Sequence, residues 1–210
     1  MKNDNLSGKK PKIAVCGVGS RGAEALSIAR EKMNVGDYDF DKIKFIPIGN
    51  LGFSPYICAD PLSYPLFKDC VRPRGFEQYS RQLRKEGKIL SRFGYAVILC
   101  DISECRIWAR LCADSFYALD AAKCAKDAGC APFIIFFQTY ESYPKRNTKE
   151  IKDVLNTFKR EKISYCLVKP DKSSSENIHS INPDEKFYNK AANKAIETVR
   201  QICETGKIEP

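Results

Sequence analysis

The 210-residue sequence predicts an α/β fold: a mostly parallel, Rossmann-like, three-layer domain in which helices cover both faces of one sheet. Apolar runs of strand length alternate with segments of helical periodicity along the chain. These runs are apolar at nearly every position, which is typical of parallel strands buried on both faces. A glycine-rich turn follows the first run, where nucleotide-binding α/β folds have their phosphate turn.

The expected elements follow one another in a regular order. Strands are predicted at 12–16, 43–48, 95–100, 131–137 and 163–170. Helices are predicted at 22–33, 76–94, 103–129, 147–162 and 186–204. Residues 49–76 are rich in Gly, Pro and aromatic residues and are predicted to form a long irregular excursion, a kind of loop that usually carries function or packs on itself. We therefore predict one domain at 12–205, with a disordered tail at 1–11 and a short tail at 206–210.

The chain has a formal net charge of +9, which favours acidic partners such as nucleotides, nucleic acid, an anionic membrane or an acidic protein. Much of the excess lies in Arg72–Arg92, which contains seven Arg and Lys residues but only Glu77 and Glu86 as acids. This segment is predicted to dock on an acidic partner or an anionic surface, although a solvated helix face has the same composition. The sequence contains no motif of a known nucleic-acid-binding module.

Cysteine usage and hydropathy indicate a cytoplasmic protein. The ten cysteines are scattered without any CxxC pair, and His179 is the single histidine, so no metal cluster is expected. Several cysteines fall inside apolar runs, which predicts reduced thiols that serve as small core residues. No apolar run approaches the ~18 residues that a membrane span requires, so no transmembrane segment is expected.

The turn after the first strand is the strongest local motif. Its spacing, Gly17-x-Gly19-x-x-Gly22, matches the dinucleotide fingerprint, in which glycines let the backbone and a helix N-terminus approach a phosphate. The candidate phosphate-binding residues are Gly17, Val18, Gly19, Ser20, Arg21 and Gly22. The second strand lacks the terminal acid that takes ribose hydroxyls, so an NAD-dependent oxidoreductase fits poorly. A purely structural alternative is that the glycines let the helix pack close to the sheet.

Four segments in the right order carry a resemblance to a known family. They are "KIAVCGVGSRGAEAL" (12–26), "KFIPIGN" (44–50), "ILSRFGYAVILCDIS" (89–103) and "YNKAANKAIETVRQICETGKIEP" (188–210). Together with the segments between 118 and 173, they resemble the N-terminal nucleotide-binding domain of FtsZ, the tubulin-like division GTPase. The resemblance rests on segment order and apolar pattern.

The resemblance implies a guanine-nucleotide site, with GTP or GDP as the ligand. It places Asn50 after the second strand, where the family has an asparagine, and Arg146 in the ribose-side loop. Asp171, after Pro170, falls where the family reads guanine, and Tyr188 falls where an aromatic ring stacks on the base. It also implies self-association or contact with another FtsZ-like or cytoskeletal protein.

Departures from the family pattern argue against hydrolysis. The family's glycine- and threonine-rich phosphate loop is replaced by "DISECRIWARLCADSFYAL" (101–119), which contains no glycine but two arginines, Arg106 and Arg110. The sequence also stops before the family's catalytic acidic loop. We therefore expect a divergent guanine-nucleotide-binding or pseudo-GTPase module that acts through protein contacts, cytoskeletal or regulatory. Two alternatives stay open: a Rossmann-type nucleotide or dinucleotide enzyme or sensor, and an interaction module with a vestigial site.

Overall fold

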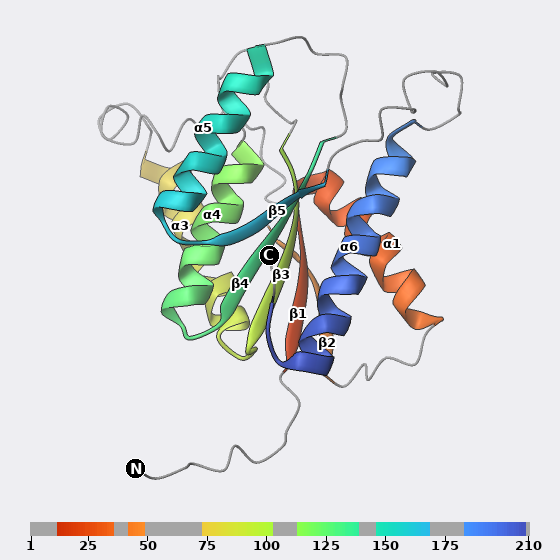
Figure 1. Ribbon diagram of the computed structural model, residues 1–210. Coiled ribbons are helices and arrows are strands. Elements are labelled where there is room, and N and C mark those ends of the chain that lie inside the picture. The colour runs from red at the N-terminus through yellow and green to blue at the C-terminus, as the bar shows by residue number, and fades with distance from the viewer. Residues whose placement is uncertain are drawn as a thin grey trace.

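The computed structural model describes residues 12–35, 42–48, 73–102, 113–138, 146–168 and 183–208. With the labels of Figure 1, the strands are β1 (Ile13–Val18), β2 (Ile43–Ile48), β3 (Tyr95–Asp101), β4 (Ala131–Phe137) and β5 (Ser164–Val168). The helices are α1 (Gly19–Asn34), α3 (Pro73–Leu90), α4 (Ala113–Asp127), α5 (Arg146–Arg160) and α6 (Pro183–Thr205). Strands and helices alternate, which confirms the predicted α/β fold class.

All strand pairs in the described sheet are parallel, in the order β2-β1-β3-β4-β5. Ile13 lies level with Ile43 on one side and with Tyr95 on the other. The chain leaves β1 toward one edge of the sheet and later continues from β3 toward the other edge. The carboxyl ends of β1 and β3 therefore form the topological switch point, where open α/β sheets bind their ligands.

Two cores lie on opposite faces of the sheet, because successive strand residues point to opposite sides. Ala14, Cys16 and Val18 face α3, α4 and α5, whereas Ile13 and Val15 face α1 and α6. Figure 1 shows these two helical layers flanking the sheet, with α1 and α6 side by side. Burial on both faces explains why β1 and β3 are apolar at every position except Asp101, the last residue of β3.

Helix α1 packs unusually close to the sheet. A Cβ at Gly17 would lie 2.2 Å from the carbonyl oxygen of Gly22, and a Cβ at Gly22 would lie 2.8 Å from the carbonyl oxygen of Leu99. Strand β1 continues through Val18, beyond the predicted end at residue 16, so the turn itself is made at Gly19, whose φ is +67°. Two of the three fingerprint glycines therefore serve helix packing, and the third serves the turn.

Several helices and strands begin or end at other residues than predicted. Both α3 and α6 begin earlier than predicted, each with a proline, Pro73 or Pro183, at its first residue. Proline suits that position because its fixed φ is helical and its missing N–H has no partner to lose there. Beyond the end of α6, the Tyr95 hydroxyl donates to the carbonyl of Gly206, and Ile208 packs on the α1/α6 core. Residues 206–208 thus join the packed domain.

No helix in the described ranges has both the length and the apolar character needed to cross a membrane.

We expect Gly17→Ala to lower the free energy of unfolding by about 3 kcal/mol, because the new methyl overlaps backbone atoms that cannot move without shifting α1. Gly129→Ala is the matched control, because Gly129 has a φ of +84° but no atom within 4 Å of an added Cβ. That control costs only the left-handed conformation, about 1 kcal/mol. Urea unfolding measures both, and equal losses would contradict the close approach of α1.

Candidate functional site

The candidate site lies at the carboxyl ends of β1 and β3, where α1 begins. Val18 is the N-cap residue of α1, with an extended backbone (φ −93°, ψ 126°), and its apolar side chain makes no capping hydrogen bond. The first turn of α1 also contains no acidic residue. The positive end of the helix dipole and its first N–H groups therefore receive no compensation from the cap or first-turn side chains, which is the character of an anion site.

An ion pair joins the start of α1 to the end of β3 at this site. Nη1 of Arg21, in the first turn of α1, donates to Oδ2 of Asp101, the last residue of β3, over 2.7 Å. The side chain of Asp101 is fully buried, and that of Arg21 is 16% exposed. A charge-assisted hydrogen bond of this length is among the stronger polar contacts in proteins. It fastens the start of α1 to the end of β3.

Arg21 therefore has a protein partner at the place where the sequence suggested a phosphate. Its role as a phosphate ligand stays a prediction. The partner, Asp101, was missed by sequence reasoning, although a signal was present. A carboxylate that ends a buried apolar strand must find a cation or hydrogen-bond donors, because an unpaired buried charge is very costly.

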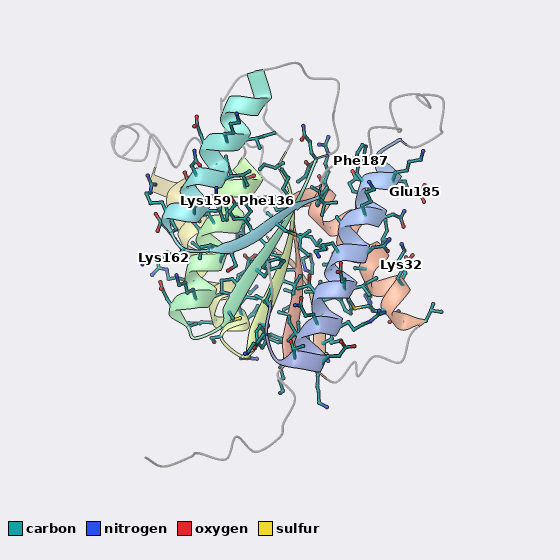
Figure 2. The ribbon with its side chains drawn as sticks, viewed as in Figure 1. Lys32, Phe136, Lys159, Lys162, Glu185 and Phe187 are labelled. Carbon is teal, nitrogen blue, oxygen red and sulfur yellow. The ribbon has the colours of Figure 1, made fainter. Side chains whose placement is uncertain are left out.

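Tyr188 lies at the same carboxyl edge of the sheet, in the second turn of α6. Its ring packs nearly perpendicular to that of Phe137, the last residue of β4, with ring centroids 5.9 Å apart. The ends of β1 and β4 are separated by two strand spacings, about 10 Å. Figure 2 labels Glu185 and Phe187 beside it, near the start of α6. Tyr188 is half-buried, so part of its side chain reaches solvent.

The roles of the remaining predicted residues stay predictions. Arg146 is the first residue of α5, which packs on the face opposite α1 and α6. Asn50 and Asp171 lie outside the described residues, as do Arg106, Arg110 and most of the segment that replaces the family's phosphate loop. The structure thus unites Gly17–Gly22 with Asp101, and puts Tyr188 at the same edge of the sheet.

A second buried polar pair lies between α3 and α4. The Tyr117 hydroxyl donates to Oε2 of Glu86, and both residues are almost fully buried. Burying a carboxylate in the α3/α4 interface without a hydrogen-bond donor would be costly, and the Tyr117 hydroxyl supplies that donor. Glu86 therefore serves packing rather than the surface charge of α3.

Two buried thiols, those of Cys16 and Cys130, are not poised for nucleophilic chemistry. Burial raises the pKa of the Cys16 thiol above its usual range, and burial raises the pKa of Cys130 to about 11. Protonated, buried thiols are unreactive at neutral pH. Within the described ranges, no group of three or more His, Cys, Asp or Glu residues could hold a metal ion.

Among solved structures, the fold is similar to that of CetZ from Methanosaeta thermophila strain DSM 6194, a protein of the tubulin/FtsZ family. The TM-score is 0.58, the match covers 90% of this chain and 54% of the CetZ chain, and the sequence identity is 11%. The chain thus spans about half the length of that relative. The match confirms, at the level of the fold, the resemblance to the FtsZ/tubulin nucleotide-binding domain.

No model of a known protein family matches the sequence, and no curated protein matches it either.

The Arg21–Asp101 pair yields an asymmetric prediction. Arg21→Met leaves a fully buried carboxylate without its guanidinium, so the free energy of unfolding should fall by about 3 kcal/mol. Asp101→Asn should cost less, about 1–2 kcal/mol, because the partly exposed Arg21 can turn toward water.

A urea-unfolding cycle with both single variants and the double variant measures this coupling. The double variant should lose clearly less than the sum of the two single losses. Additivity within about 0.5 kcal/mol would mean that the pair makes no net contribution.

Proposed function

We propose that this chain is an FtsZ-like module that binds a guanine nucleotide at the carboxyl edge between β1 and β3 and acts through protein contacts. The supporting observation is the start of α1, which Gly17 and Gly22 bring against β3 at the topological switch point without an acidic side chain in its first turn. A phosphate is the ligand that such a helix start favours. The fold likeness to CetZ supports the choice of a guanine nucleotide as the proposed ligand.

The base and ribose contacts in this proposal come from the sequence resemblance. Tyr188 is proposed to stack on the base, and its position supports this because Phe137 holds the ring at the carboxyl edge. Asp171 is proposed to accept hydrogen bonds from guanine, Arg146 to contact the nucleotide from the ribose-side loop, and Asn50 to contact it after the second strand. GTP or GDP is the proposed ligand.

The proposed binding is weak, and hydrolysis is proposed to be slow or absent. Asp101 already neutralises Arg21, so a phosphate must compete with a buried carboxylate for the guanidinium. The glycine-free segment that follows Asp101 cannot wrap a triphosphate with backbone amides as the family loop does. A pseudo-GTPase that signals through self-association or through another cytoskeletal protein in the cytoplasm fits these properties.

One observation favours a second candidate, an interaction module with a vestigial site. Gly17 and Gly22 are required by helix packing, and Arg21 is engaged by Asp101. These residues would therefore persist in a protein that binds no nucleotide at all. Only a ligand measurement separates this candidate from the first.

Thermal unfolding with GTP, GDP, ATP and NAD, with and without Mg²⁺, tests the proposal. A guanine nucleotide at 100 times its Kd should stabilise the folded protein by about 2.7 kcal/mol. A shift with NAD alone would favour the Rossmann-type alternative, and no shift with any nucleotide would favour the vestigial site.

Ser20→Glu sharpens the test, because Ser20 is exposed in the first turn of α1. The new carboxylate should stabilise the helix by about 0.3–1 kcal/mol through its dipole. The same charge beside a bound phosphate costs between about 1 and 4 kcal/mol, depending on screening, so the nucleotide affinity should fall at least about fivefold.

Ser27→Glu is the matched control, because it adds the same charge to an exposed position of α1 about 10 Å further along the helix. Its nucleotide affinity should stay within about twofold of the parent, since that separation is close to a Debye length in physiological salt. Isothermal titration calorimetry measures the nucleotide affinity of the parent protein and of both variants. Equal affinity in Ser20→Glu and Ser27→Glu would place the phosphate elsewhere.

A further inference from the structure

The outer surface of the α3/α4/α5 layer is strongly basic. We define the basic face as the exposed cations of this layer: Arg81, Arg84, Lys85, Lys88, Arg92, Lys126, Lys152, Lys159, Arg160 and Lys162. Figure 2 labels Lys159 and Lys162 on α5 and the turn that follows it. The acid that the sequence places within the α3 row, Glu86, is withdrawn into the core by its bond to Tyr117. Folding therefore makes this surface more basic than its composition suggests.

The sheet brings cations from three helices together at one edge. Tyr95 lies level with Ala131, and Phe133 lies level with Ser164, so β3, β4 and β5 begin at the same edge. Helices α3, α4 and α5 end just before these strands and therefore end side by side. Lys126, at the end of α4, donates to the carbonyls of Glu161 and Lys162, which joins two of these ends.

The basic face also extends along α3. Arg81, Lys85 and Lys88 are spaced by four and three residues, so they form one exposed row about 10 Å long. Arg92 continues this row in the turn that follows the helix. The cations thus extend away from the sheet edge as well as along it.

The described carboxylates of this layer are fewer than its cations: Asp127 and Asp153 are exposed, and Glu161 is half-buried. The Glu161 carboxylate forms an ion pair with Nζ of Lys123 at 3.0 Å, and its other oxygen lies 3.8 Å from Nε of Arg160. The hydrogen bond from Lys123 and the surrounding cations lower the pKa of the Glu161 carboxyl, as expected in a positive potential. In the part of the chain that the structure describes, Lys85, Lys88, Arg92, Lys159 and Lys162 have no carboxylate within ion-pair distance.

Helix dipoles account for only part of the pattern. Lys88, Lys126, Lys159 and Arg160 occupy last turns, where a cation complements the negative end of a helix. This effect fades within one turn, so it does not extend to Arg81 or Lys152. A surface for an external polyanion accounts for both groups.

We propose that the basic face binds the backbone phosphates of a nucleic-acid duplex without reading its sequence. The α3 row, formed by Arg81, Lys85 and Lys88, has no exposed acid between its members, and such a row matches the regularly spaced phosphates of a duplex. Among the described residues, Val35 is the only large apolar side chain that is strongly exposed, and it follows α1 on the other face. The described side chains of the α3/α4/α5 layer therefore include neither strongly exposed apolar groups of the kind that peripheral membrane helices insert nor strongly exposed rings that could stack on single-stranded bases.

This inference is independent of the nucleotide site, because the basic face and the start of α1 lie on opposite faces of the sheet. Fluorescence anisotropy with a short labelled DNA duplex of arbitrary sequence tests it. If about five phosphates are contacted, log Kd should rise with log salt concentration with a slope of about 4–5. A second duplex of unrelated sequence should bind within about threefold of the first.

Lys85→Glu/Lys88→Glu should weaken duplex binding by at least about a hundredfold, because two contacts become repulsive. Arg30→Glu/Lys186→Glu is the matched control, since it makes the same change of net charge at exposed positions of α1 and α6. The control should lose less than about fivefold, and thermal unfolding should be similar in both variants.

Three outcomes overturn the proposal. They are equal losses in the two double variants, absence of salt-dependent duplex binding, and tighter binding to phosphatidylserine vesicles or to polyglutamate than to the duplex. The last outcome would assign the basic face to a membrane or to an acidic protein.

Discussion

The contact between the start of α1 and the paired strands β1 and β3 is the constraint on which the site depends. Gly17 and Gly22 touch through their backbones, and Gly22 also meets the carbonyl of Leu99. This approach is possible only without side chains, because a methyl group at either position would overlap backbone atoms. It brings the first turn of α1 to the switch point of the sheet and puts Arg21 within reach of Asp101.

The Arg21–Asp101 pair gives that contact its electrostatic character. A buried carboxylate requires a strong partner, and Arg21 supplies it from the same turn whose N–H groups favour an anion. The pair therefore secures the fold and at the same time opposes tight phosphate binding. This double role is why both a weak nucleotide site and a vestigial one follow from the same geometry. On the opposite face, the Glu86–Tyr117 bond similarly removes an acid from a surface that then becomes basic.

Much of the fold could be predicted from local patterns. Continuous apolar runs identified the central strands β1, β3 and β4, because most of their residues lie between two helical layers, whereas the edge strands β2 and β5 are only partly buried. The likeness to the FtsZ nucleotide-binding domain held at the level of the fold, although it rested on segment order. The predicted position of the turn was less accurate, since Gly17 and Val18 belong to β1. The spacing of glycines alone does not distinguish a turn from a site of close helix packing. Tyr188 lies at the carboxyl edge of the sheet, where its stacking on a base stays a prediction, and Asn50 and Asp171 lie outside the described residues.

The sequence by itself determined the class of fold, the presence of a helix directly after β1, and the excess of positive charge, because each follows from residue types at short spacing. Only the tertiary structure decided which charges meet. Arg21 and Asp101 are 80 residues apart, and their pairing depends on β3 lying beside β1. Glu86 looked like a surface acid in a basic helix, and its burial depends on Tyr117 of a different helix. Helical periodicity gives the angle of a side chain around its own axis, but a neighbouring element decides whether that angle faces water.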